Sequence, residues 1–196
     1  RHYMKPLDPD YVLEMSREGF DPHLDLAKFA GDVTQEDIDD YNAGKRPDLK
    51  AVRKAYKVVN YSATYGVGAP KLAREAGMSQ KDAKKLLTAF WERNWAIQNV
   101  AGSLRVRELF GTMWLQNPVS KFWYQLRSDK DRFSTLNQGT GVFCFDSWVA
   151  ICRQNGLQTI GQFHDEVIVI TKLGDENETE GIMKGAVEKL NTKLSL

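Results

Sequence analysis

The sequence predicts an α+β fold that is mainly helical and contains a short antiparallel β-hairpin flanked by helices. Apolar side chains recur at helical intervals over residues 83–97 and 182–194, as expected for amphipathic helices. Strand character is clearest in residues 157–163 and 167–170, which are rich in β-branched and apolar side chains. The polar residues His164-Asp165-Glu166 separate these two segments, and this arrangement predicts a hairpin.

The first part of the chain is predicted to form short helices. We expect helices over residues 10–15 and 24–30, interrupted by Gly19-Phe20-Asp21-Pro22. The acidic run at residues 36–40, followed by Asn42-Ala43-Gly44, indicates a solvated helix end and a turn. These carboxylates could bind a metal, but a hydrated surface is the favoured interpretation.

Two longer helices are expected next. The first covers residues 49–65 and ends where Gly66 and Gly68 supply flexible or left-handed positions. The second begins at Ser79, which stands at capping-box spacing from Asp82. Its apolar positions share one face and are interpreted as core. These positions are Ala83, Leu86, Leu87, Phe90 and Ile97.

The remainder of the chain combines short strands with two helices. Residues 110–124 are rich in turns and aromatic side chains, which favours irregular or short-strand structure. Helical character returns over residues 131–151. Residues 178–196 form an amphipathic pattern, and this last helix is expected to cover one face of the hairpin's sheet.

Composition excludes several classes of protein. No apolar stretch approaches the roughly 18 residues needed to span a bilayer, so a cytoplasmic location without membrane contact is the default expectation. The net charge is +1, so any argument for nucleic-acid binding must be local. Cys144 and Cys152 lack partners at zinc-ligand spacing and are interpreted as buried thiols.

One predicted helix carries a chemically ordered stripe. Arg53, Lys57, Tyr61 and Tyr65 recur every four residues, so each step advances only about 40° around the helix and about 6 Å along it. Two cations precede two aromatic rings, and a nucleoside triphosphate has the same polarity. The alternative is an ordinary amphipathic helix with the tyrosines in the core and the cations in solvent, which spacing alone favours.

The predicted hairpin places a carboxylate at its tip. Asp165 would be held rigidly there, and strand alternation would point it away from His164 and Glu166 unless the turn intervenes. Aspartate is a suitable ligand for Mg2+, which takes one or two protein carboxylates. The alternative is a polar turn in which Asp165 caps backbone amides. A hydrolase triad is discounted because the sequence has no Gly-x-Ser-x-Gly elbow.

Four segments in order resemble the family A DNA polymerases. Residues 53–66 are similar to the family's motif B, and His164-Asp165-Glu166-Val167 is similar to motif C. Gly19-Phe20-Asp21-Pro22-His23 resembles its Gly-x-Asp-x-His segment, and Gln138-Gly139-Thr140 resembles its Gln-Gly-Thr motif. The resemblance spans nearly the whole chain. It implies fingers and part of a palm, acting with primer-template DNA, dNTP and Mg2+.

The resemblance implies a role for each matching residue. Lys57, Asp165 and Glu166 are expected to be catalytic, with Asp165 as the Mg2+ ligand. Tyr61 would pack on the deoxyribose and allow dideoxynucleotides, and Tyr65 would lie near the templating base. The incoming dNTP would contact Arg53, Lys57, Tyr61, Tyr65, Gly66 and His23. DNA would contact Gln138, Ser134, Lys130 and His164. Lys130 and Ser134 depart from the commonest family pattern, where Arg and Asn often stand.

The implied organisation has three parts. Residues 1–20 would join palm and fingers, residues 21–118 would form the fingers, and residues 119–196 would form a partial palm with the hairpin. The family's motif A would precede His2-Tyr3-Met4, so the fragment is expected to be inactive alone. With that segment added, the expected reaction is two-metal nucleotidyl transfer from dNTP to a primer 3′ hydroxyl. The alternatives are a non-catalytic nucleotide- or nucleic-acid-binding module derived from a polymerase domain and a plain helical scaffold.

Overall fold

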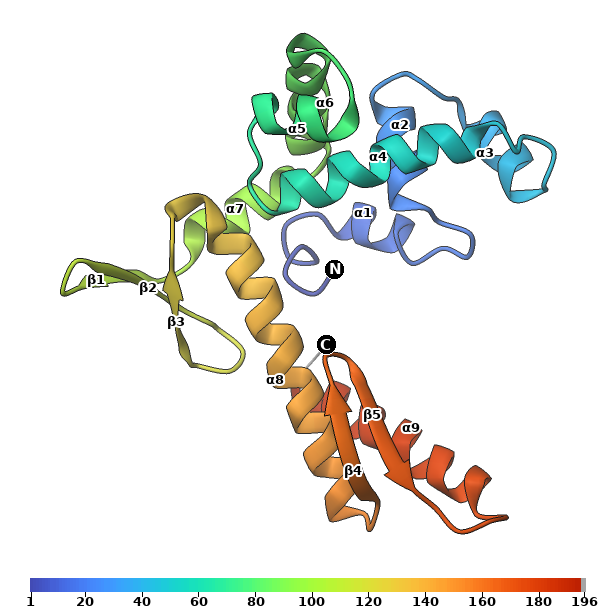
Figure 1. Ribbon diagram of the computed structural model, residues 1–196, viewed down its shortest axis with the longest axis vertical. Coiled ribbons are helices and arrows are strands. Elements are labelled where there is room, and N and C mark those ends of the chain that lie inside the picture. The colour runs from blue at the N-terminus through green and yellow to red at the C-terminus, as the bar shows by residue number, and fades with distance from the viewer. Residues whose placement is uncertain (195–196) are drawn as a thin grey trace.

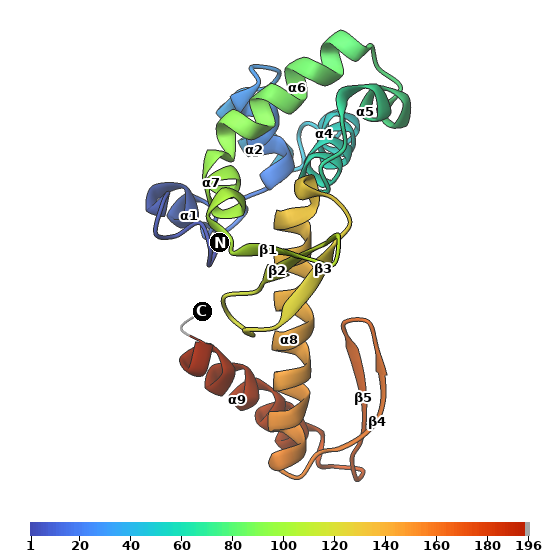
Figure 2. The same ribbon diagram turned by 90° about the vertical axis from the view of Figure 1, so that its left-hand side faces the viewer.

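The computed structural model describes residues 1–194, which form a helical body, a long central helix and two small antiparallel sheets (Figures 1 and 2). This arrangement confirms the predicted α+β class. Seven helices build the body: α1 (Pro9–Glu14), α2 (Pro22–Phe29), α3 (Gln35–Asn42), α4 (Leu49–Thr64), α5 (Ala69–Ala76), α6 (Gln80–Arg93) and α7 (Trp95–Ser103).

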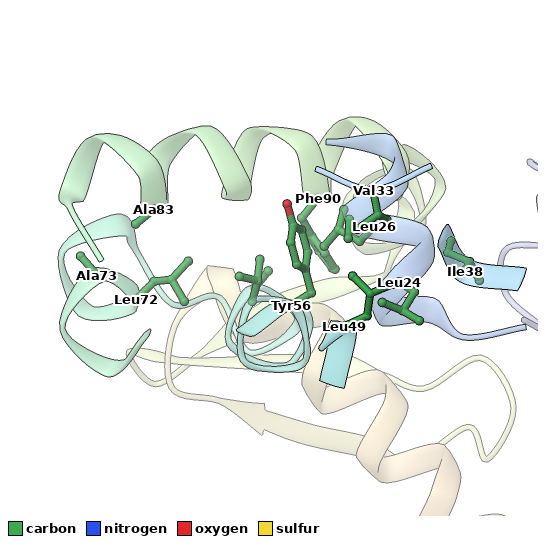
Figure 3. Close-up of a cluster of buried hydrophobic side chains, with 13 residues drawn as sticks. Leu24, Leu26, Val33, Ile38, Leu49, Tyr56, Leu72, Ala73, Ala83 and Phe90 are labelled. Atoms are coloured by element: carbon green, nitrogen blue, oxygen red, sulfur yellow. The ribbon is translucent and has the colours of Figure 1, made fainter. Parts of the chain in front are cut away.

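Helix α4 lies across the main hydrophobic core of this body. Its buried face presents Leu49, Tyr56 and Val59 to side chains of α2, α5 and α6, among them Leu24 and Phe90 (Figure 3). The Tyr56 hydroxyl also donates a 2.5 Å hydrogen bond to Asp32. Because Tyr56 fills the core, the opposite side of α4 is free to carry the cationic and aromatic stripe.

The body differs from the prediction at two places. Helix α5 was missed, although Pro70 near its start and Gly77 at its end with φ of 66° are typical boundary residues. The helix expected from Ser79 through Ile97 is two helices. Asn94 separates them, and its side-chain amide donates to the carbonyl of Phe90 at 2.9 Å. The predicted start was correct, since the Ser79 hydroxyl accepts from the backbone N–H of Asp82.

The central helix α8 (Arg132–Gln154) supports both sheets. The first sheet has the order β1-β2-β3, formed by β1 (Val106–Leu109), β2 (Thr112–Gln116) and β3 (Trp123–Leu126). It packs on α8 through β2 and β3, and a short 3-10 turn, η1 (Asp129–Asp131), leads into α8. The expected short-strand structure in residues 110–124 is thereby confirmed.

The second sheet is the predicted hairpin, formed by β4 (Gln158–Phe163) and β5 (Glu166–Ile170). The following helix α9 (Glu176–Leu194) does not cover this sheet, contrary to prediction. Ala186 packs instead with Cys152 and Leu157, and the indole N–H of Trp148 donates to the carbonyl of Met183 at 3.0 Å. Figure 2 shows α9 and the hairpin on opposite sides of α8. Ser195 and Leu196, the end of the predicted helix, lie outside the described residues.

None of the helices within residues 1–194 is sufficiently long and apolar to cross a bilayer.

Cys152 is buried and Cys144 is half-buried, and both are free thiols. Burial raises the pKa of each thiol, which agrees with the interpretation of unreactive cysteines.

Candidate nucleotide-binding face and hairpin carboxylate

The predicted stripe of α4 lies on an exposed face of the helix. Tyr61 is 52% exposed and Tyr65 is 46% exposed, which contradicts the alternative that places these rings in the core. The ammonium group of Lys57 lies 5.7 Å from the centre of the Tyr61 ring. Two further exposed cations of α4, Lys50 and Lys54, are spaced seven and three residues before Lys57 and enlarge the same cationic face.

The end of α4 is set by Gly66. This residue has φ of 68°, and the N–H of Val67 donates to the carbonyl of Ser62 while the N–H of Gly66 donates to Ala63. These two bonds form a Schellman motif, in which glycine tolerates the left-handed position. A Cβ at Gly66 would lie 3.2 Å from the carbonyl oxygen of Lys130. The predicted turn is therefore confirmed, and it also brings Gly66 against the segment before α8.

The segment before α2 lies close to the cationic end of the stripe on α4. Asp21 caps α2 by accepting from the backbone N–H groups of His23 and Leu24, and it forms an ion pair with Arg53. The imidazole of His23 lies 6.1 Å from the Tyr61 ring, and the side-chain amide of Asn60 lies 3.2 Å from its Nδ1. Arg53, Lys57, Tyr61 and His23 thus form one cluster, which we call the α4 face.

The charge states within the α4 face follow from its contacts. Partial burial raises the pKa of Asp21, but the hydrogen bond from Arg53 and those from Leu24 and His23 outweigh burial and lower the pKa overall. Burial lowers the pKa of His23, and the charges of Arg53 and Lys57 lower it further against the opposing charge of Asp21. His23 is therefore a neutral imidazole at pH 7, ready to accept a proton when an anion binds.

A groove of about 610 Å³ lies between α8 and β3, and Tyr65 at the end of α4 borders it. Tyr65, Ser134 and Gln138 line it together, and the Gln138 amide donates a 2.9 Å hydrogen bond to the Tyr65 hydroxyl. Lys130 lines a neighbouring hollow with Gly66. The structure therefore brings the predicted DNA-contacting residues of α8 and η1 next to the aromatic end of α4.

Gly139 and Thr140 have structural roles that sequence reasoning did not assign. A Cβ at Gly139 would lie 2.8 Å from the ring of Tyr124, so only glycine allows this ring to pack on α8. The Thr140 hydroxyl accepts from the fully buried amide of Asn117 at 2.8 Å and lies 2.6 Å from the hydroxyl of Tyr3. These contacts fix the orientation of the helix turn that presents Gln138 to the groove.

Replacing Gly139 by Ala tests this close approach. Gly139 and Gly141 lie two residues apart in α8, but nothing stands within 4 Å of a Cβ at Gly141. Both alanines gain about 1 kcal/mol of helix propensity. Overpacking against Tyr124 costs about 1–3 kcal/mol, so we expect Gly139→Ala to be less stable than Gly141→Ala by that amount in chemical denaturation. Equal stability of the two variants would contradict the packing argument.

The hairpin places His164 and Asp165 in a two-residue turn, because Phe163 pairs with Glu166. His164 has φ of 49°, a left-handed conformation that non-glycine residues adopt at some cost. The turn therefore replaces the predicted alternation of faces at these positions. Asp165 is exposed, as expected for a tip carboxylate. Both views show this tip at the end of the hairpin nearer the helical body (Figures 1 and 2).

The described residues do not build a complete metal centre. Within residues 1–194, no group of three His, Cys, Asp or Glu side chains is arranged to hold a metal ion. The exposed carboxylate of Asp165 can bind Mg2+, which commonly keeps water and substrate phosphate as its other ligands. The acidic run of α3 is a capped, ion-paired helix, with Asp37 bound by Thr34 and Arg46, and it agrees with the favoured surface interpretation.

The fold of residues 1–194 is that of a portion of a polymerase domain. No family model and no curated protein matches the chain. Among solved structures, the chain is similar to the POL domain of Pol1 from M. smegmatis, determined in complex with DNA primer-template and dNTP. The TM-score is 0.70 with 18% sequence identity over 96% of this chain. The match covers 34% of that chain, so the present sequence spans about a third of its length.

Proposed function

We propose that this chain is the nucleotide-binding portion of a template-directed DNA polymerase, which transfers nucleotides from dNTPs to a primer 3′ hydroxyl. The observation that supports this proposal most directly is the order of charged and aromatic side chains on the α4 face. Exposed Lys57 and the ion-paired Arg53 precede the exposed ring of Tyr61, with neutral His23 beside them. The likeness of the fold to a POL domain in complex with primer-template and dNTP supports the same conclusion.

The α4 face would bind the nucleotide in a fixed direction. Lys57 supplies a compact charge and Arg53 a planar fork for the triphosphate oxygens, and Arg53 is already oriented by Asp21. Tyr61 offers its ring to the sugar. These residues position the triphosphate and stabilise its charge, which is the main protein contribution to phosphoryl transfer.

The groove beside Tyr65 would hold the base pair. Gln138 is a hydrogen-bond donor there, and minor-groove acceptors occupy similar places in every correct pair, so it would contact DNA without sequence preference. A templating base at Tyr65 would have to displace the Gln138 hydrogen bond. Movement of α4 relative to α8 would then couple base pairing to closure of the site.

Asp165 would contribute one ligand to a catalytic Mg2+, with Glu166 beside it. Bound divalent metal would activate the primer hydroxyl and neutralise the charge on the leaving pyrophosphate. The second candidate function is a non-catalytic nucleotide- or nucleic-acid-binding module, which would use the α4 face without Asp165.

Primer extension by the full-length gene product separates these two functions. The protein is incubated with Mg2+, labelled primer-template and each dNTP in turn. A polymerase extends the primer by one nucleotide only with the complementary dNTP. Tight binding of primer-template and dNTP without any extension would reject the proposed catalysis and establish the binding module.

Triphosphate binding should be coupled to protonation of His23. Its pKa lies below the usual value in the free protein, and a nearby phosphate favours the imidazolium, so binding raises this pKa. We therefore expect dNTP affinity to increase as the pH falls from 7 toward the lowered pKa of His23 in the free protein, by at most about tenfold per pH unit. Calorimetric titration in buffers of different ionisation enthalpy measures the proton uptake.

His23→Gln should abolish this proton uptake, whereas His2→Gln, at a histidine outside the α4 face, should leave it unchanged. Equal proton uptake by the wild-type protein and His23→Gln would place the titrating group elsewhere.

A further inference from the structure

The β1-β2-β3 sheet has two faces of different chemistry. Strand pairing places Val106, Leu115 and Tyr124 on one face, and Leu115 is buried where this face packs against α8. The next residues along each strand, which point to the opposite side, are Arg107, Trp114 and Gln125. Figure 2 shows the sheet beside α8 and apart from the β4-β5 hairpin. The outer face is therefore separate from the hairpin that carries Asp165, and its residue Gln125 also lines the groove beside Tyr65.

The outer face carries positive charge and aromatic rings but no carboxylate. Trp123 lies opposite Gln116 in the next row, and Arg105 precedes β1. Glu108, the only acidic residue in these three strands, has the register of the inner face. Arg105 and Arg107 are both exposed, and neither forms an ion pair with any of residues 1–194.

The two arginines are arranged around one ring. The guanidinium carbon of Arg107 lies 3.9 Å from the centre of the Trp123 ring, and that of Arg105 lies 5.4 Å from it. Arg105 also donates to the side-chain carbonyl of Gln116 at 3.2 Å. At the β1-β2 turn, Phe110 is 95% exposed and has φ of 50°. The sheet thus presents two guanidinium groups that already pack on the Trp123 ring, together with the solvent-exposed ring of Phe110.

We propose that this outer face binds an unpaired nucleic-acid strand. Proteins that bind single strands combine cations along the phosphate backbone with aromatic side chains on which bases stack, and Arg adds cation–π contacts. An acidic peptide would match the charge but would leave the exposed ring of Phe110 without a stacking partner. The inference goes beyond the proposed nucleotide site, because binding here needs neither dNTP nor Asp165.

Binding of fluorescein-labelled dT20 by the full-length protein, followed by anisotropy, tests this proposal. A double variant, Arg105→Gln with Arg107→Gln, removes both cations at exposed positions and should preserve the fold, which thermal melting checks. We expect about tenfold weaker binding of dT20, and the slope of log affinity against log salt should fall by about 1.4 for two lost phosphate contacts. Arg74→Gln, at an exposed arginine on α5, is the matched control and should bind normally.

Substitutions of Trp123 and two other nucleic acids test which class of ligand the outer face binds. Trp123→Phe should retain most of the affinity for dT20, whereas Trp123→Ala should lose about fivefold or more. A 20-base-pair blunt duplex should compete poorly with dT20 and should be bound equally by the wild-type protein and the double variant. An rU20 strand shows whether the sugar matters, since the proposal requires only phosphates and unstacked bases.

Several outcomes would overturn the inference. One is unchanged dT20 affinity and salt slope in the folded double variant. Another is Arg105- and Arg107-dependent binding of a polyglutamate peptide with no such dependence for dT20, which would identify the face as a protein-binding surface. Primer extension with the double variant on a one-nucleotide overhang provides a separate readout. It reports the proposed polymerase function, whose failure would leave the strand-binding result intact.

Discussion

Replacing Asp165 by Ala is expected to lower the rate of nucleotide incorporation by the full-length protein about a thousandfold. A metal ion stabilises the transition state of phosphoryl transfer by several kcal/mol, and each 1.36 kcal/mol corresponds to a factor of ten in rate. Asp165 is exposed in a two-residue turn, so its removal should not disturb the core. Single-turnover primer extension at saturating dNTP measures the effect.

Two comparisons make the Asp165 result specific. Glu188→Ala removes an exposed carboxylate from α9 and should leave the rate within twofold of wild type. Primer-template affinity of Asp165→Ala should also remain close to wild type, because the loss is in chemistry. A variant without Asp165 that extends primers at the normal rate would remove this residue from the mechanism.

Replacing Arg93 by Met is expected to reduce the free energy of unfolding by about 3–5 kcal/mol. Arg93 donates to Asp25 at 3.0 Å and to Glu14 at 2.8 Å, and its guanidinium carbon lies 3.5 Å from the centre of the Tyr11 ring. Asp25 is only 3% exposed, so loss of Arg93 leaves a buried carboxylate with the Tyr11 hydroxyl at 3.1 Å and the more distant Lys28 ammonium at 3.7 Å as its remaining partners. The network joins α1, α2 and α6.

Urea denaturation measures this loss, with Arg74→Met as the control at an exposed arginine of α5. The control should change the free energy of unfolding by no more than about 0.5 kcal/mol. The double variant Arg93→Met with Asp25→Leu should recover stability, since an apolar pair can replace a buried ion pair. A change below 1 kcal/mol in Arg93→Met alone would show that Asp25 finds another partner or solvent.

The sequence predicted features that depend on local spacing. The four-residue recurrence of Arg53, Lys57, Tyr61 and Tyr65 locates one face of α4, and their exposure supports the functional interpretation over the core alternative. The turn at Gly66 and the hairpin tip at Asp165 were predicted for the same reason, since glycine and polar turn residues act locally. The assigned roles of these residues in binding and catalysis stay predictions.

Features that depend on tertiary contacts were not predictable. The hydrogen bond between Tyr3 and Thr140 joins residues 137 positions apart, and the ion pair between Asp21 and Arg53 joins two separate helices. The amphipathic pattern of α9 indicated an apolar face but not which neighbour it covers, so the choice of the hairpin over α8 was wrong. The break at Asn94 was missed because apolar periodicity continues through it.

The proposed division at residues 20/21 and 118/119 also stays a prediction. The second boundary falls in the connection between β2 and β3, two strands that pair with each other. Limited proteolysis of the full-length protein would show whether the chain is cut there. The pairing of β2 with β3 predicts that this connection can be nicked while the sheet remains assembled.

The affinity of the α4 face for nucleotides of decreasing phosphate number tests the central claim most directly. Equilibrium titration of the full-length protein on primer-template with dNTP, dNDP and dNMP should show affinity falling steeply as phosphates are removed. Lys57→Ala should remove most of this difference, whereas Lys81→Ala, at an exposed lysine of α6, should preserve it. Equal affinity for dNTP and dNMP, or the same phosphate dependence in Lys57→Ala, would contradict triphosphate binding by this face.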